Sequence, residues 1–213
     1  EKKLIKEQEI PSGHNPEDYI VERLECKSHD GRIVPITITR HKKTKIDGSA
    51  NLLLYGYGSY GNSMSPGFSS TRLSLINRDI IWVTAHIRGG MERGMKWWKE
   101  GKLLNKKNSF KDYIAVAKFL IEKKYTSNKK IIGMGGSAGG LLMGAVVNQA
   151  PELFLGIIMA VPFVDSLTTN LDHSLPLTVG EFEEFGNAKK NKEHFDYIYS
   201  YAPYNNIKKM DYP

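Results

Sequence analysis

Residues 130–149 read KIIGMGGSAGGLLMGAVVNQ. The stretch begins with a mostly apolar run, Lys130–Met134, and ends in a helix-forming segment, Ala138–Gln149, which Ala150-Pro151 closes. Between the two stands Gly135-Gly136-Ser137-Ala138-Gly139, which fits the pattern G-x-S-x-G. When an apolar run precedes this pattern and a helix follows it, the serine occupies a sharp turn from a strand into a helix. The stretch therefore predicts a buried strand, a tight turn and a helix.

Three further short apolar runs, each ending near glycine or proline, accompany this strand. Short runs without polar alternation suit strands that a parallel sheet buries on both faces. Strands that alternate with helices indicate an α/β fold, so we expect a mostly parallel sheet with helices on both faces. The three runs are Leu52–Tyr55, Ile80–Ala85 and Gly156–Val161.

Two more helices are predicted between these strands. Apolar residues recur at helical spacing from Phe110 to Ile121. Ser109 and Asp112 resemble a capping box at the start of this helix. Residues 70–78 predict a second, weaker helix.

The amino-terminal part of the chain has a different pattern. Tyr19–Lys27 and Ile33–Arg40 flank an Asp30-Gly31 step, and this arrangement predicts an antiparallel hairpin. Residues 1–18 are polar and contain two prolines, so we expect a connector there, with a short strand at Lys3–Ile5.

Composition limits the class of protein. The 213 residues, 40% of them hydrophobic, suffice for one sizeable core, so one domain is expected. The net charge of +7 permits an anionic partner, but scattered lysine pairs such as Lys106-Lys107 are typical of a solvated surface. No stretch of about 18 apolar residues predicts a membrane span. We therefore expect neither nucleic acid nor a membrane as partner. The single cysteine, Cys26, excludes an internal disulfide and a cysteine-based zinc site, and it suits a cytoplasmic protein.

Ser137 is the candidate nucleophile. Glycines two residues before and after it remove side chains that would clash in a strained backbone. The N–H of Ala138 and the helix N-terminus supply positive potential where an oxyanion develops. The alternative is a glycine-rich turn that cradles a phosphate. The sequence has no Walker lysine, but Asp165 lies near the position where a dinucleotide fingerprint needs its acidic residue, so this alternative stays open.

A serine nucleophile also needs a second oxyanion donor, an acid and a base. Tyr57 follows the strand Leu52–Tyr55, so its phenol can donate to an oxyanion; alternatively it is a packing tyrosine in a glycine-rich loop. In α/β-hydrolase sequences the order is serine, acid, histidine. Only His173 and His194 follow Ser137, both in polar segments without a buried strand before them. The sequence therefore predicts that the base lies beyond this chain.

The densest acidic cluster of this basic chain is Gly180–Gly186, in which Glu181, Glu183 and Glu184 are interleaved with two phenylalanines. Carboxylates among aromatic rings can receive a guanidinium or ammonium group. As a bare pattern, however, the cluster favours a solvated helix face. Both interpretations stay open.

Five motifs of this chain occur in the same order in the prolyl oligopeptidase family of serine peptidases, and the last two are typical of its oligopeptidase B (protease II) branch. The chain resembles that branch over nearly its whole length. The motifs are Tyr55–Gly61, Arg88–Gly90, Gly135–Gly140, Val161–Asp165 and Pro176–Asn187.

The resemblance implies that residues 19–213 are part of an α/β-hydrolase catalytic domain and that residues 1–18 are the end of a β-propeller and a connector. It also implies an endopeptidase that hydrolyses short peptides after Arg or Lys through an acyl-enzyme, with no metal or organic cofactor. Ser137 would be its nucleophile, and Tyr57 with the Ala138 N–H would form its oxyanion hole.

The resemblance further assigns the substrate-binding residues. Glu181 and Glu183 match the acidic pair that receives the Arg or Lys side chain, and Phe163 matches an aromatic that lines the neighbouring subsite. In the family the catalytic Asp and His, with the last two strands, lie downstream of the position of Pro213. We therefore expect a C-terminally truncated domain that is inactive alone, lacks most of the propeller, and exposes the apolar run Gly156–Val161 at a sheet edge. The alternative is an inactive fragment or a non-enzymatic basic α/β module that binds acidic partners.

Overall fold

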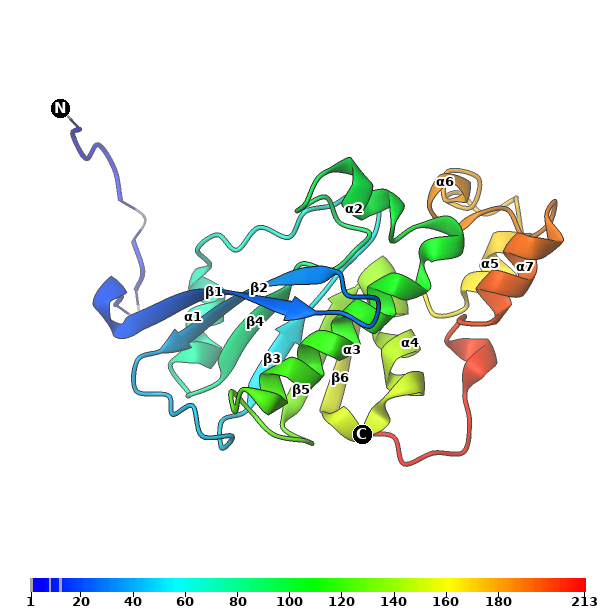
Figure 1. Ribbon diagram of the computed structural model, residues 1–213. Coiled ribbons are helices and arrows are strands. Elements are labelled where there is room, and N and C mark those ends of the chain that lie inside the picture. Colours follow the sequence, from blue (N-terminus) through cyan, green and yellow to red (C-terminus); the bar gives the residue numbers. More distant parts are fainter. Residues whose placement is uncertain (1, 8, 12) are drawn as a thin grey trace.

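The computed structural model describes residues 2–7, 9–11 and 13–213, and its centre is one six-stranded sheet with the strand order β1-β2-β4-β3-β5-β6 (Figure 1). β1 pairs antiparallel with β2, and β2 pairs antiparallel with β4. All pairs among β3 to β6 are parallel. The strands are β1 Tyr19–Lys27, β2 Ile33–His41, β3 Leu52–Tyr55, β4 Ile81–Ala85, β5 Ile131–Gly136 and β6 Phe154–Ala160. The α/β fold, the mostly parallel sheet and the hairpin are thus confirmed.

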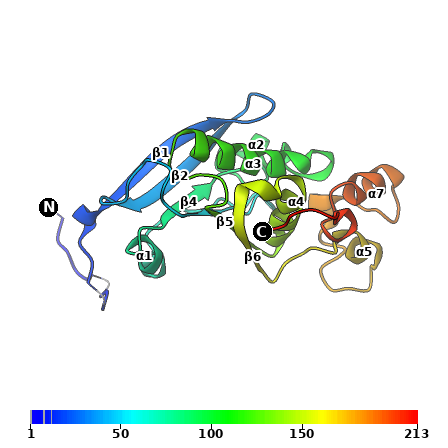
Figure 2. The same cartoon turned by 90° about the horizontal axis from the view of Figure 1, so that it is seen from below.

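Helices cover the sheet from two sides. α3 and α4 pack against the main core, whereas α1 lies on the opposite side of the sheet from α3 (Figure 2). α5, α6 and α7 form a separate group beside α4 (Figure 1). The helices are α1 Ser70–Ile76, α2 Met95–Lys99, α3 Lys107–Glu122, α4 Ala138–Gln149, α5 Ser166–Leu171, α6 Phe182–Phe185 and α7 Lys192–Tyr199.

The strand β3 shows why its sequence is apolar without alternation. Leu52 and Leu54 are fully buried in the main core, which α3 and α4 cover. Leu53 and Tyr55 point to the other face, where they pack with Trp82 in a second, smaller cluster. Because successive side chains of a strand point to opposite faces, both faces of this strand need apolar residues.

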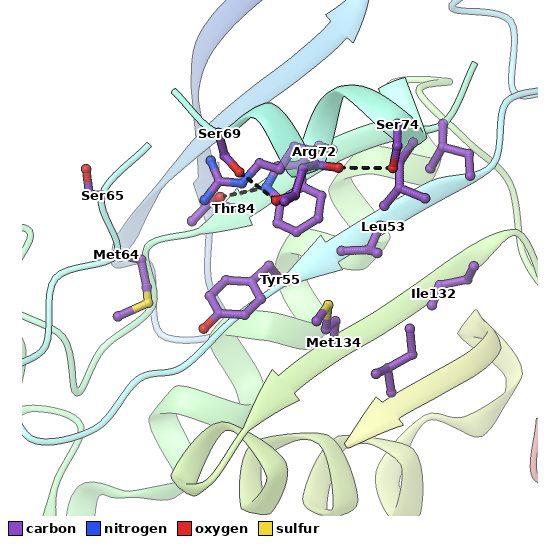
Figure 3. A pocket seen from close by; sticks show the side chains of 15 residues that line it. Leu53, Tyr55, Met64, Ser65, Ser69, Arg72, Ser74, Thr84, Ile132 and Met134 are labelled. Carbon is purple, nitrogen blue, oxygen red and sulfur yellow. Dashed lines mark hydrogen bonds between the residues drawn. The ribbon is translucent and has the colours of Figure 1, made fainter. Parts of the chain in front are cut away.

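The face covered by α1 retains a large hollow. A cavity of about 680 Å³ lies there, and Leu53, Tyr55, Ile132 and Met134 line its floor while Arg72 of α1 borders it (Figure 3). α1 is only seven residues long, so it covers only part of this apolar face.

One capping prediction is wrong. α3 begins at Lys107, so Ser109 and Asp112 lie inside the helix. The Ser109 hydroxyl donates to the Arg88 carbonyl oxygen at 2.7 Å, and the buried Asp112 carboxylate accepts two hydrogen bonds from the Arg88 guanidinium. The two polar side chains are therefore used in tertiary contacts rather than in capping. The predicted strand at Lys3–Ile5 is also wrong, because these residues have no regular structure.

β6 forms one edge of the sheet, as expected for the run Gly156–Val161. It pairs with β5 alone within the described part of the chain. Leu155, Ile158 and Met159 are 51%, 44% and 40% exposed. An apolar edge strand is a template for pairing with another strand. Within the residues described, no helix has both the length and the apolar character needed to cross a bilayer.

Candidate active site

Ser137 occupies a strained turn between β5 and α4. Its backbone has φ +55° and ψ −118°, a conformation that costs a side-chain-bearing residue about 1–3 kcal/mol. The Ser137 N–H donates to the Ala160 carbonyl oxygen at 2.8 Å, and the Ser137 carbonyl oxygen accepts from the Phe163 N–H at 3.1 Å. The side chain of Ser137 is exposed. The turn therefore presents a serine hydroxyl to solvent above the end of the sheet.

The glycines around Ser137 are required by close backbone contacts. A Cβ atom at Gly135 would lie 2.3 Å from the Gly139 carbonyl oxygen. A Cβ atom at Gly139 would lie 2.9 Å from the Gly56 carbonyl oxygen, on the loop that follows β3. The motif glycines thus allow the strand, the helix and this loop to approach one another closely.

Tyr57 and Ala138 lie at the same end of the sheet as Ser137. β3 and β5 are adjacent and parallel, so the residues that follow them share one edge. The Tyr57 ring lies 3.3 Å from the position that a Cβ atom of Gly139 would take. Burial raises the pKa of the half-buried Tyr57 phenol, which therefore stays protonated and able to donate. Ala138 is the first residue of α4, so its N–H has no acceptor within the helix.

The three glutamates around α6 have three different environments. Glu184 is buried, accepts from the Trp98 indole N–H at 2.8 Å, and lies 3.2 Å from the Lys106 ammonium. The Glu183 side chain is 74% exposed and lies 3.1 Å from the Lys102 ammonium. Glu181 is half-buried. A solvated helix face therefore describes Glu183 but not Glu184.

Glu181 accepts a hydrogen bond from the Tyr60 hydroxyl at 2.6 Å through one of its carboxylate oxygens. Burial raises the pKa of Glu181, and the nearby Glu184 carboxylate raises it further. The Tyr60 hydroxyl and the Lys106 ammonium oppose that rise. A half-buried carboxylate whose charge is only partly compensated is suited to receive a cationic group.

A row of aromatic rings links these residues. The centroids of Tyr57 and Tyr60 are 6.2 Å apart, those of Tyr60 and Phe185 are 5.9 Å apart, and those of Phe185 and Phe163 are 5.5 Å apart. Tyr57, Phe163 and the Tyr60 partner Glu181 therefore belong to one cluster. Spacing alone does not mark Tyr60 or Phe185 as site residues, although both lie inside motifs named above.

The prediction of a solvated surface for the pair Lys106-Lys107 is wrong for Lys106. Its side chain is only 1% exposed. Its ammonium donates to the Gly58 carbonyl oxygen and to the Ser59 hydroxyl, both at 2.6 Å. Lysine pairs in sequence carry no signal that distinguishes a buried member from an exposed one.

The two downstream histidines have other partners than Ser137. The His173 ring packs edge-on against Phe182 with centroids 5.0 Å apart. His194 accepts from the Asn187 N–H at 3.0 Å through Nδ1. No hydrogen bond joins the Ser137 hydroxyl to a histidine within residues 2–7, 9–11 and 13–213. Over the same residues, no group of three or more His, Cys, Asp or Glu side chains is arranged to hold a metal ion.

Comparison with known proteins gives consistent matches. The sequence profile of the prolyl oligopeptidase family matches residues 66–213. The chain is 45% identical over 214 residues to dipeptidyl aminopeptidase BI of Pseudoxanthomonas mexicana, covering 100% of this chain and 29% of that protein. It is 45% identical over 213 residues to protease 2 of Moraxella lacunata, covering 100% of this chain and 31% of that protein.

Solved structures give the same result. Oligopeptidase B from Trypanosoma brucei, in a closed form with covalently bound antipain, superposes with a TM-score of 0.96 at 41% identity, covering 100% of this chain and 30% of that one. Oligopeptidase B from Leishmania major gives a TM-score of 0.95 at 44% identity, covering 98% and 29%. The chain spans less than a third of the length of the curated relatives that it matches.

Proposed function

The chain belongs to the prolyl oligopeptidase family, and from that premise we propose that it carries the nucleophile, the oxyanion hole and the basic-residue subsite of a serine oligopeptidase. The observation that carries the proposal is the exposed Ser137 at φ +55°, next to Tyr57 and the first N–H of α4. A phosphate-cradling turn has no need of a strained, side-chain-bearing residue at this position, whereas a nucleophile does.

The chemistry follows from the positions of the donors. The Ser137 Oγ attacks the carbonyl carbon of the scissile peptide bond and loses its proton to a base. The Tyr57 hydroxyl and the Ala138 N–H donate to the resulting oxyanion. The carbon–nitrogen bond then breaks, the amine leaves with the proton returned by the base, and water hydrolyses the acyl-enzyme. We assign the base and its orienting acid to parts of the full-length protein outside this chain.

Substrate choice rests on the acidic segment. Glu181 would pair with the guanidinium or ammonium of an Arg or Lys residue before the scissile bond, because its second carboxylate oxygen remains available beside the one that Tyr60 occupies. Glu183 would add negative potential from its exposed position. Phe163 would line the neighbouring subsite with its ring. We therefore propose short peptides cleaved after Arg or Lys as substrates.

The same proposal covers the organisation of the full-length protein. Residues 1–18 would connect a β-propeller to the catalytic domain, and residues 19–213 would be part of that domain. The apolar β6 edge and the half-covered apolar face under α1 are suited to contacts with its remaining part. A cytoplasmic location is consistent with the single cysteine, Cys26, which is buried and unpaired.

The test uses the full-length protein with an arginine amide substrate and an arginine-mimicking phosphonate that labels activated serines. Ser137→Ala should lower turnover at least about 10,000-fold and abolish labelling. Ser127→Ala, at the other end of β5, is the matched control and should leave both unchanged. The 213-residue chain alone should not be labelled. Undiminished turnover in Ser137→Ala would remove the nucleophile assignment, and rapid labelling of the isolated chain would show that a base lies within it, with His173 and His194 as candidates.

A further inference from the structure

The ammonium of Lys106 makes three contacts inside the protein. It donates to the Gly58 carbonyl oxygen and the Ser59 hydroxyl at 2.6 Å each, and to the Glu184 carboxylate at 3.2 Å. A lysine ammonium has three N–H donors, so these acceptors satisfy it completely. The side chains of Lys106 and Glu184 are 1% and 3% exposed. The three protein acceptors therefore replace the water molecules that an exposed ammonium would bind.

These contacts connect the two halves of the proposed site. Gly58 and Ser59 directly follow Tyr57, the proposed oxyanion donor. Glu184 lies three residues after Glu181, the proposed receptor of the substrate cation. The second carboxylate oxygen of Glu184 accepts from the Trp98 indole at 2.8 Å and is thereby fixed to α2. One buried ion pair thus joins the Tyr57 loop to the Glu181 segment, in addition to the hydrogen bond from Tyr60 to Glu181.

A buried ion pair is by itself weak evidence for a stabilising contact. Burial lowers the pKa of Lys106, and the Glu184 carboxylate only opposes that shift, so the protein bears a desolvation cost. Well-packed apolar residues of similar volume are often as stabilising as a buried ion pair or more so. The charges therefore suggest a function in geometry and electrostatics.

The two charges also act on Glu181. The groups that influence the pKa of its carboxylate are Tyr60, Glu184 and Lys106. The Glu181 carboxylate in turn contributes to the raised pKa of the Tyr57 phenol. The Lys106 ammonium lowers the pKa of Glu181, and the Glu184 carboxylate raises it. Removing one charge should shift the titration of Glu181 in one direction, and removing the other should shift it in the opposite direction.

We propose that Lys106 and Glu184 are positioning residues that hold the oxyanion loop and the cation-binding segment in one fixed arrangement and balance the charge at Glu181. This inference rests on the proposed function and extends it to two residues that do not touch the substrate. A positioning role predicts effects on both turnover and cation affinity, whereas a purely structural role predicts effects on stability alone.

The experiment measures binding of butylguanidinium, and of its neutral isostere butylurea, to the full-length protein by calorimetry from pH 4 to pH 8. It also measures kcat with an arginine amide and with a neutral ester. The midpoint is the pH at which butylguanidinium affinity falls to half its maximum as Glu181 becomes protonated. Glu184→Gln should move this midpoint to lower pH. Lys106→Met should move it to higher pH, and the double variant should return it close to the wild-type midpoint. Lys107→Met, at a half-buried residue whose ammonium lies over the Tyr197 ring, should leave it unchanged.

The double variant keeps the test decisive if Lys106→Met fails to fold, because it leaves no unpaired buried charge. It should bind butylguanidinium with a near-normal midpoint. Its kcat should nevertheless fall about 10- to 100-fold on both substrates, because Gly58 and Ser59, next to Tyr57, have lost their contacts with the Lys106 ammonium. Wild-type kcat in the double variant, or an unmoved midpoint in Glu184→Gln, would overturn the inference. Equal wild-type affinity for butylguanidinium and butylurea would instead overturn the cation subsite of the proposed function.

Discussion

The turn at Ser137 and the acidic segment around α6 are built in different ways. Ser137 is held by backbone groups, namely the Ala160 carbonyl oxygen and the Phe163 N–H, and by glycines that admit close contact. The acidic segment is held by side chains from distant elements, so neighbouring glutamates become buried, half-buried or exposed. The geometry of the proposed nucleophile is therefore a property of the local backbone, whereas that of the proposed cation site is a property of tertiary contacts.

This difference predicts different responses to substitution. A side chain added at the turn meets backbone atoms that cannot move aside, so the damage should be large and independent of substrate. Removal of one carboxylate charge from the acidic segment should have an effect whose size depends on which glutamate is changed. Each carboxylate differs in exposure and in its partner.

The largest effect is expected for Gly135→Ala. The added Cβ atom would lie 2.3 Å from the Gly139 carbonyl oxygen, so β5 and α4 would have to separate. We expect the free energy of unfolding to fall by about 3 kcal/mol, measured by denaturant titration. Gly156→Ala on β6 is the control, because no atom lies within 4 Å of the added Cβ position. Equal losses in the two variants would show that the turn is not sterically determined.

An intermediate effect is expected when the two proposed cation ligands are neutralised separately. Glu181→Gln should raise KM for an arginine amide about 10-fold or more. The reason is that solvent only weakly screens the attraction between a half-buried carboxylate and the substrate cation. Glu183→Gln should raise it only about twofold, because its side chain is 74% exposed. KM for a neutral ester should not change in either variant. Similar effects from both substitutions would mean that burial does not determine how strongly each carboxylate contributes to binding of the arginine substrate.

The smallest effect is a pH-dependent gain in stability for Glu181→Gln. Since the pKa of Glu181 is raised in the folded protein, chiefly by burial, its contribution to stability is present at low pH and is lost as the pH rises through the folded-state pKa. The variant should therefore have a slightly higher Tm than the wild type at pH 7. The difference should vanish at about pH 3, below the unfolded-state pKa, where the carboxyl is protonated in both the folded and unfolded chains. A lower Tm for the variant at pH 7 would contradict the sign.

Sequence patterns predicted the locally determined parts of this molecule well. The strand Leu52–Tyr55 and the helix Ala138–Gln149 have the predicted bounds, and Ser137 lies at the expected turn. These elements are encoded by short-range patterns of apolar residues and glycines. The resemblance to the prolyl oligopeptidase family is likewise confirmed, because its motifs are contiguous segments.

The parts that were missed depend on residues far apart in the sequence. Lys106 and its partner Glu184 are separated by 78 positions, and nothing in either neighbourhood indicates that they meet. Ser109 and Asp112 have the spacing of a capping box, yet Arg88 engages both. In each case a polar side chain that could serve its own helix or the solvated surface instead contacts a residue far away in the sequence. Local sequence patterns carry no information about such tertiary contacts.

The burial of Cys26 has a practical consequence. Burial raises the pKa of its thiol to about 11, so almost none of the reactive thiolate is present at neutral pH, and the side chain is 2% exposed. Maleimide dyes should therefore leave the native chain unlabelled. A surface variant such as Ser174→Cys, beside the acidic segment, would then accept a single fluorophore without removal of Cys26. Its emission could report whether that loop responds to the proposed basic peptide substrates.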